Sequence, residues 1–202
     1  MPGAEAQTNS PHSAAIQPTQ LLPSLFKHLE EEQRITVFHV GPALQETIDF
    51  FSAYRCKLHF LDLFSELPII TEEESSASLR SSFEELLDIP EDTQFDICLF
   101  WDIFNFLDRD AVHAFLAALR PHINHATRAH AFGLHNLGSE RMNHLYGVRE
   151  LESLSIRHRN TPLPGYAPYS QQKLKDLLYC FKFERSVLLP DSRLELLLRA
   201  KA

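Results

Sequence analysis

The stretch from Arg34 to Leu63, RITVFHVGPALQETIDFFSAYRCKLHFLDL, contains three successive elements with different patterns. An apolar run over Ile35–Val40 predicts a buried strand, and the Gly-Pro pair that follows predicts a tight turn. An apolar stripe over Leu44–Tyr54 predicts a helix, and Lys57–Leu61 predicts a second buried strand that ends at an acid. This order of strand, turn, helix, strand and acid is typical of the front half of a nucleotide-binding α/β unit.

The turn of this unit has one glycine, Gly41, whereas nucleotide-binding turns usually have two or three. Glycines there let the backbone adopt positive φ and lie against a ligand. A residue with a Cβ in that conformation costs roughly 1–2 kcal/mol. The side chains of Leu44 and Gln45 are also expected to point into the space that a ligand needs. The layout therefore predicts the fold and leaves cofactor binding open.

The composition is that of an ordinary globular protein. Of 202 residues, 44% are hydrophobic and 23% are charged, which suits one domain with a full core. The formal net charge of −8 argues against general nucleic-acid binding, because an acidic surface repels phosphate backbones. Arg157, His158 and Arg159 could form a local basic patch, but we favour a solvated strand with alternating charge.

We expect residues 1–20 to form a disordered N-terminal tail, because they include almost no large apolar side chains. Residues 21–202 are expected to form a single α/β domain. The chain has neither a signal-peptide pattern nor a run of about 18 apolar residues, so no membrane association is expected. Three cysteines without metal-type spacing fit small core residues in a reducing compartment, and the predicted location is cytoplasmic.

Strands and helices continue to alternate after the opening unit. The clearest strand is Phe95–Trp101, FDICLFW, which is apolar throughout, as expected for a strand buried on both faces of a parallel sheet. The other predicted elements are helices over Leu21–Gln33, Ala77–Leu87, Asp110–Leu119 and Gln171–Cys180, a short helix over Glu140–Tyr146, and strands over Arg128–Phe132 and Leu151–Arg159.

The C-terminal segment differs from the rest. Phe183–Leu189 and Leu194–Arg199 predict two strands, and the short connection between them forces an antiparallel pair. The sequence therefore predicts an α/β fold with a mostly parallel central sheet, helices on both faces and a C-terminal antiparallel hairpin.

Four local features, with the order of the elements, resemble the class I S-adenosylmethionine-dependent methyltransferases over roughly Ile35 to Lys201. Residues 37–47, VFHVGPALQET, are similar to the family's first loop, and Asp62 is similar to its ribose-binding acid. Residues 86–107, LLDIPEDTQFDICLFWDIFNFL, resemble the stretch from the adenine loop through the fourth strand. The terminal helix and hairpin resemble the family's reversed last strand. The resemblance implies a Rossmann-like methyltransferase fold with S-adenosylmethionine as its possible cofactor.

The resemblance also implies which residues would hold the cofactor. These are His39, Gly41, Pro42, Ala43, Asp62, Leu63 and Trp101. Asp62 would accept the ribose hydroxyls, and Trp101 would stack on adenine, although a lone buried tryptophan is more often a core residue. His39 stands where the family has an acid, and Ala43 and Gln45 stand where it has glycines. A neutral histidine cannot balance the ammonium group of the ligand, and Pro42 has no N–H to offer its carboxylate.

Asp102 and Asn105 are the candidate catalytic residues, because the resemblance places them where the methyl acceptor would lie. Asp102 could orient or deprotonate the acceptor, and Asn105 could form a hydrogen bond to it. The alternative is that Asn105 to Asp108 cap the following helix.

Two functions remain open at this point. The first is a methyltransferase that acts on a small molecule or a protein side chain. The alternative is a catalytically inactive protein of the same fold that serves as an interaction or regulatory module with a protein partner. A nicotinamide-dependent enzyme is less favoured, because of the terminal hairpin.

The histidines His122, His125, His130 and His135 have no suitable partners nearby, so no metal site is expected.

Overall fold

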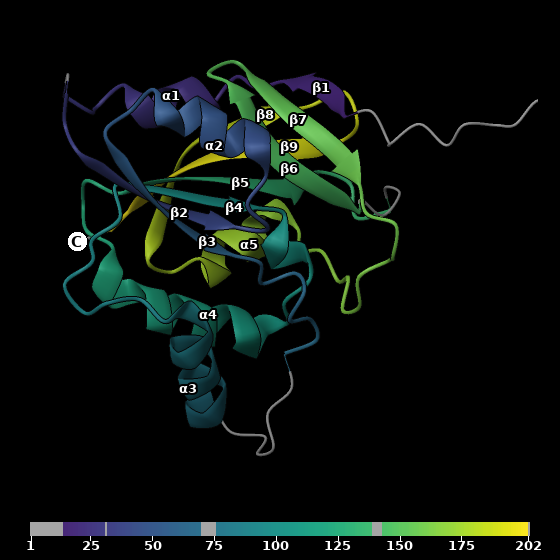
Figure 1. Ribbon diagram of the computed structural model, residues 1–202. Helices are drawn as coiled ribbons and strands as arrows, with labels where there is room; N and C mark the ends of the chain where they lie inside the picture. The colour runs from purple at the N-terminus through teal and green to yellow at the C-terminus, as the bar shows by residue number, and fades with distance from the viewer. Residues whose placement is uncertain (1–13, 31, 70–75, 139–142, 202) are drawn as a thin grey trace, which may run out of the picture.

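The computed structural model describes residues 14–30, 32–69, 76–138 and 143–201 (Figure 1). Its main sheet has six strands in the order β3-β2-β4-β5-β9-β8. The strands are β2 (Ile35–Val40), β3 (Cys56–Leu61), β4 (Ile97–Trp101), β5 (Arg128–Leu134), β8 (Phe181–Leu188) and β9 (Arg193–Ala200). The first four run parallel, β9 is antiparallel to β5, and β8 is antiparallel to β9. The predicted parallel sheet and terminal hairpin are both confirmed.

Helices cover both faces of this sheet (Figure 1). They are α1 (Leu22–Phe26), α2 (Gln45–Ser52), α3 (Ser76–Leu87), α4 (Arg109–Leu119) and α5 (Gln171–Leu177), with 3-10 turns η1 (Ile103–Asn105) and η2 (Arg120–His122). Side chains of α3, α4 and α5 share one core cluster, and those of α1 and α2 lie in another. Side chains alternate between the faces of β4, so Phe100 belongs to the first cluster and Leu99 to the second.

A second, three-stranded antiparallel sheet has the order β1-β7-β6. Its strands are β1 (Ala15–Pro18), β7 (Ser153–His158) and β6 (His144–Glu150). It packs against α2, where the Val148 N–H donates to Thr47 Oγ1 at 3.0 Å. The short helix predicted over Glu140–Tyr146 is therefore wrong from His144 onward, and residues 139–142 lie outside the described part. The buried side chains of His144, Tyr146 and Val148 recur every second residue, which is the period of a strand.

The predicted disordered tail of residues 1–20 is wrong from Ala15 onward, whereas residues 1–13 lie outside the described part. Ala15–Pro18 pairs with β7, and Thr19 is buried. The carboxylate of Glu195 on β9 accepts hydrogen bonds from the N–H groups of Gln20 and Leu21, at 3.0 and 3.1 Å, and from the Thr19 hydroxyl. Backbone pairing and a buried carboxylate order this segment, although its composition predicts disorder.

Two other boundaries differ from the predictions. The helix expected over Leu21–Gln33 ends at Phe26, and Glu32 has a φ of 63°, a left-handed conformation that a helix cannot include. The α5 helix begins as predicted, with the Ser170 hydroxyl accepting from the Lys173 N–H, but it ends at Leu177. No helix in the described ranges is long and apolar enough to cross a membrane.

Candidate functional site

The residues predicted to form a site lie where the parallel strands β2, β3 and β4 end. Because β2 lies between β3 and β4 in the sheet, Gly41 at its end lies between Asp62 and Asp102. Ligands of open α/β sheets bind across the carboxyl ends of the strands. The strand order therefore brings the predicted residues of three strands to one edge.

Gly41 makes the turn that follows β2. Its φ of 127° is strained for any residue with a side chain. A Cβ at this position would lie 3.5 Å from His39 Cε1 and 4.0 Å from the Phe64 ring, so the turn passes close to both rings. The Gln45 side chain is exposed and bonds Asp49 Oδ1 at 2.7 Å, so it extends along α2. The expectation that Gln45 points into the ligand space is therefore wrong.

His39 is fully buried, and its Nε2 accepts a hydrogen bond from Trp101 Nε1 at 3.2 Å. Burial lowers the pKa of His39 to about 4, although backbone groups of Gly41 and His39 partly offset the effect. The imidazole is therefore neutral at physiological pH. This residue supplies no negative charge for the ammonium group of a ligand, as the sequence predicts.

Trp101 ends β4 in an unusual conformation, with a φ of 52° and a register shift in the pairing of β4 with β5. Positive φ at a bulky residue is a strained state that often marks a functional region. The indole stacks on Tyr146, with centroids 5.4 Å apart and an interplanar angle of 13°. The face of the indole that stacks on Tyr146 is therefore already covered by a protein ring. The stacking of Trp101 on adenine stays a prediction.

Asp102 follows Trp101 and is 1% exposed. Its Oδ2 accepts a hydrogen bond from the Tyr146 hydroxyl at 3.2 Å, and its Oδ1 is buried without a hydrogen-bond partner in the described structure. Burial raises the pKa of Asp102 to about 7, despite the hydrogen bond from Tyr146 and the positive charges of Arg159 and Arg193. A carboxyl group with this pKa is suited to accept or donate a proton at neutral pH.

Asn105 lies in η1 and is buried. Its backbone carbonyl accepts from the Ala167 N–H at 2.8 Å, whereas its side-chain Oδ1 has no partner among the described residues. The cap of α4 is Asp108, whose Oδ1 accepts from the Ala111 N–H at 2.8 Å. The capping role is therefore performed by Asp108, and the Asn105 side chain remains available to a ligand.

Asp62 follows β3 and is half-buried, and its Oδ1 is a buried atom with no partner in the described part of the chain. Burial raises the pKa of Asp62, and the nearby Arg159 charge partly opposes this. The next side chain, Leu63, is fully buried in the core cluster below α3 and α4. Of these two predicted residues, Asp62 has the polar atom that could bind a ligand.

The sequence did not predict the role of Tyr146, which joins Asp102 to Arg193. Arg193 Nη1 donates to the Tyr146 hydroxyl at 3.2 Å, and its Nε donates to Asp191 Oδ2 at 2.8 Å. Burial raises the pKa of Tyr146, so the hydroxyl keeps its proton and can donate it to Asp102. Tyr146 comes from β6, whose first residues were predicted to be helical, so no sequence signal placed it here.

The strand expected at Arg157–Arg159 is confirmed as far as His158, which is exposed, but the two arginines are only partly solvated. Arg157 forms an ion pair with Glu46 of α2, with Nη2 and Oε2 3.2 Å apart. The Arg159 guanidinium lies 4.4 Å from the centre of the Phe64 ring, and its Nε donates to the His144 carbonyl at 3.2 Å. Both arginines are partly buried, and the charge of Arg159 lowers the pKa of Asp62 and of Asp102 against the effect of burial.

Two of the histidines that could suggest a metal have other partners. His130 Nε2 lies 2.9 Å from Glu195 Oε1, and His122 Nδ1 lies 3.0 Å from the Thr93 carbonyl. Within the described ranges, no group of three or more histidine, cysteine or acidic side chains could hold a metal ion.

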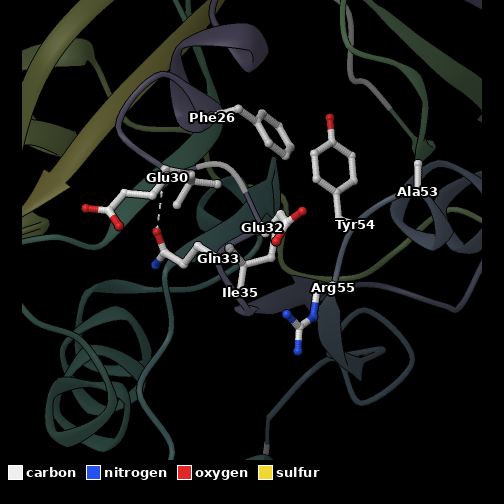
Figure 2. Close-up of a pocket in the computed structure, with 9 residues that line it drawn as sticks. Phe26, Glu30, Glu32, Gln33, Ile35, Ala53, Tyr54 and Arg55 are labelled. Atoms are coloured by element: carbon white, nitrogen blue, oxygen red, sulfur yellow. Dashed lines mark hydrogen bonds between the residues drawn. The ribbon is translucent and has the colours of Figure 1, made fainter.

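A cavity of about 600 Å³ lies at the opposite edge of the sheet, where β2 and β3 begin. Phe26 and Tyr54 form one wall of it, and Glu30, Glu32 and Arg55 provide charges (Figure 2). None of the predicted site residues lines this cavity. Because ligands of such sheets bind at the carboxyl ends, the polar edge at Asp62 and Asp102 is the better candidate site.

Neither a protein-family model nor a curated protein matches this sequence. Solved structures do match. The 1,6-didemethyltoxoflavin-N1-methyltransferase of Burkholderia thailandensis, solved with 1,6-didemethyltoxoflavin and S-adenosylhomocysteine, matches with a TM-score of 0.51 and 14% identity, over 90% of this chain and 77% of its own. The PH0226 protein of Pyrococcus horikoshii matches with a TM-score of 0.50 and 11% identity, over 90% and 88% of the two chains.

A longer protein also appears among the matches. The pyocyanin biosynthetic protein PhzM has a TM-score of 0.48 and 16% identity, and the match covers 89% of this chain but 54% of PhzM. This chain therefore spans about half the length of PhzM. At these identities the likeness to the two structures with TM-scores of 0.51 and 0.50 concerns the fold alone. The chain has the α/β fold of the class I S-adenosylmethionine-dependent methyltransferases.

Proposed function

We propose that the protein binds S-adenosylmethionine at the carboxyl ends of β2 and β3 and transfers its methyl group. The observation that carries this proposal is the buried Oδ1 of Asp62, which has no partner among the described residues. Asp62 follows Leu61, whose carbonyl accepts a hydrogen bond from the Gly41 N–H at 2.6 Å. A buried acceptor without a partner costs about 1–3 kcal/mol, which a ligand hydroxyl would relieve. A ribose diol supplies two such hydroxyls.

The residues around this acceptor fit the cofactor in part. Gly41 lets the backbone approach a ligand, and the Asp62 carboxylate can accept from the ribose. His39 is neutral, so it does not take the role of an acid toward the ammonium group. Pro42 and Ala43 follow in the turn, half-buried and exposed respectively, and we propose that they contact the ligand through the backbone. When bound, the cofactor supplies a methyl group on a sulfonium for in-line displacement.

Asp102 and Asn105 would act on the acceptor. With a pKa of about 7, Asp102 can take a proton from an acceptor hydroxyl or amine. The Tyr146 hydroxyl holds Oδ2 of this carboxyl group and leaves Oδ1 for the acceptor. The free Oδ1 of Asn105 can accept a second hydrogen bond and orient the same molecule. The acceptor is then a small molecule or a protein side chain with an ionisable N–H or O–H.

Calorimetric titration with S-adenosylhomocysteine tests this proposal directly. The wild type should bind the ligand and should melt at a higher temperature in its presence. Asp62→Asn keeps the size of the side chain but replaces one acceptor oxygen by a donor, so it should weaken binding by roughly 10-fold or more. Glu66→Gln, at an exposed acid four residues later, is the matched control and should bind like the wild type. No heat and no thermal shift at millimolar ligand would reject the proposal.

A second candidate function follows from the packing of the same edge. Tyr146 stacks on Trp101, and the Trp101 N–H is bonded to His39, so protein side chains already fill this part of the edge. This favours the alternative of a protein that retains the fold without the cofactor and acts through a protein partner. The same titration separates the two functions, because the alternative predicts no binding of the adenosyl ligand.

A further inference from the structure

A chain of hydrogen bonds runs from the N-terminal strand β1 to Asp102. Gln17 of β1 accepts through its Oε1 from Arg193 Nη2, and Arg193 Nη1 donates to the Tyr146 hydroxyl at 3.2 Å. The Tyr146 hydroxyl donates to Asp102 Oδ2, also at 3.2 Å. The side chains of Arg193, Tyr146 and Asp102 are at most 3% exposed. The part of the chain from the guanidinium to the carboxyl group is therefore shielded from solvent.

The guanidinium fixes the direction of this chain. An arginine side chain has only donors, so the Tyr146 oxygen accepts the bond from Arg193. Burial is the main reason why the pKa of Tyr146 is raised, so the hydroxyl keeps its single proton and points it at Asp102 Oδ2. A carboxylic acid accepts best through its carbonyl oxygen, because the oxygen that carries the proton has less negative charge. When Asp102 is protonated, we therefore expect the proton on Oδ1.

Arg193 is held in place from several sides. Its Nε donates to Asp191 Oδ2 at 2.8 Å, and its guanidinium lies 4.8 Å from the centre of the Phe132 ring. With Gln17 on Nη2 and Tyr146 on Nη1, bonds at three nitrogens set the plane of the guanidinium. Gln17 belongs to β1, whereas Asp191 precedes β9, so segments from both ends of the sequence orient the Tyr146 hydroxyl.

We propose that Arg193 is a positioning residue that acts through Tyr146, so that Oδ1 of Asp102 is the oxygen that takes a proton from the methyl acceptor. This inference rests on the proposed function. Oδ1 is the oxygen of Asp102 that is buried without a partner among the described residues. In the proton transfer, an O–H or N–H bond of the acceptor breaks and its electron pair stays on the acceptor atom. The new O–H bond forms at Oδ1.

Arg193 can influence Asp102 in two ways, through the Tyr146 hydroxyl or directly through its charge. Burial is the largest effect on the pKa of Asp102 and raises it, whereas the Tyr146 hydrogen bond and the charges of Arg159 and Arg193 lower it. The proposed positioning needs the Tyr146 hydroxyl, but a direct effect of the charge does not. Removing the hydroxyl therefore separates the two.

The experiment measures the pKa of Asp102 in the protein without ligand, by NMR of the aspartate carboxyl carbons, with Asp102→Asn to assign the signal. Tyr146→Phe keeps the ring but removes a hydrogen bond to the charged form, so it should raise this pKa by roughly one unit or more. Arg193→Met should also raise the pKa. In the Tyr146→Phe background, Arg193→Met should have a clearly smaller effect, because its route to Asp102 is already broken.

The matched control is Arg199→Met, which removes another arginine of β9. Arg199 Nε lies 3.1 Å from Glu184 Oε1 and has no printed contact with the chain to Asp102, so the pKa of Asp102 should not change. If Arg193→Met raises this pKa equally with and without the Tyr146 hydroxyl, Arg193 acts by charge alone and the positioning role is overturned.

Neutron diffraction from wild-type crystals in heavy water is a second test that needs no variant. At about pD 5, below the Asp102 pKa of about 7, the carboxyl group is protonated. A deuteron on Oδ1, with the Tyr146 deuteron pointing at Oδ2, would support the proposal, whereas a deuteron on Oδ2 would overturn it. If the wild type does not bind S-adenosylhomocysteine, the proposed function fails without any change in these two measurements, so the two failures can be told apart.

Discussion

At the scale of single residues, burial pushes two neighbouring groups toward their neutral forms. His39 at the end of β2 has a pKa lowered to about 4, and Asp102 at the end of β4 has a pKa raised to about 7. Desolvation disfavours the charged form of each, so the shifts have opposite signs. Near neutral pH His39 is then uncharged, whereas Asp102 can exchange a proton because its pKa is about 7.

Asp102 should make the protein less stable as the pH rises. Its pKa is raised in the folded state, so its contribution is fully present below the unfolded pKa of 3.8 and is lost as the pH rises through about 7. A shift of about three units corresponds to an upper bound of about 4 kcal/mol. Asp102→Asn cannot ionise, so its unfolding free energy relative to the wild type should rise between pH 4 and pH 8. Urea titrations at both pH values measure this, and a difference that stays constant with pH would contradict it.

At the scale of elements, one carboxylate joins the N-terminal strand to the sheet. Glu195 on β9 accepts from Thr19, Gln20 and Leu21, between β1 and α1, and also lies 2.9 Å from His130 Nε2. The donors lie in the segment between β1 and α1, whereas the acceptor lies on β9, the last strand of the chain. Few apolar contacts are needed to order β1 when its end is held in this way.

Glu195→Gln should lower the unfolding free energy by about 3 kcal/mol at pH 7. Burial alone would raise the pKa of Glu195, but the hydrogen bond and charge of His130 and the hydrogen bonds from Thr19 and Gln20 outweigh it and lower the pKa from 4.5 to about 2. This shift of about 2.5 units corresponds to 1.36 kcal/mol for each unit. Because the folded pKa is depressed, this stability is present above pH 4.5 and is lost as the pH falls toward 2. The deficit of the variant should therefore shrink between pH 7 and pH 3. Glu91→Gln, at an exposed acid, is the control in the same denaturation series, and an equal loss in both variants would disprove the role of Glu195.

The elements also show what the sequence could and could not predict. The bounds of β2 agree with the predicted Ile35–Val40, because its sequence is mostly apolar and the Gly41-Pro42 turn marks its end. Ala15–Pro18 and the start of β6 were missed because their order comes from partners that are distant in the chain, namely β7 and α2. Secondary-structure propensity depends on residues that are close in the sequence, so it cannot take account of partners that are distant in the chain.

Some residues of the candidate site could likewise be predicted from the sequence, and others could not. Asp62 and Asp102 could be predicted, since they follow parallel strands and the ends of parallel strands meet at one edge. Tyr146, Arg159 and Arg193 could not, because they come from β6, the end of β7 and the terminal hairpin, and no local pattern fixes where those segments lie. The residues that set the charges and hydrogen bonds of the acids are therefore visible only in the folded chain.

At the scale of the whole molecule, the main sheet separates two core clusters and belongs to both. In β4, Cys98 and Phe100 lie in the cluster under α3 and α4, whereas Leu99 and Trp101 lie in the cluster under α1 and α2. If the helices on either face detached, one face of the same strands would be exposed to solvent. The physical expectation is that the two clusters lose their structure together.

The single tryptophan makes this expectation measurable, because Trp101 reports on the cluster under α1 and α2. Unfolding by urea should give the same midpoint by Trp101 fluorescence and by far-ultraviolet circular dichroism. Phe115→Leu removes packing in the other cluster, where Phe115 is fully buried, and should cost about 1–3 kcal/mol. Because the sheet couples the clusters, this variant should lower the midpoint seen by Trp101 fluorescence as much as that seen by dichroism. Leu137→Ala, at a side chain that is 50% exposed, should change neither midpoint. A fluorescence midpoint unmoved by Phe115→Leu, with a separate earlier transition in the dichroism, would show that the two clusters unfold independently.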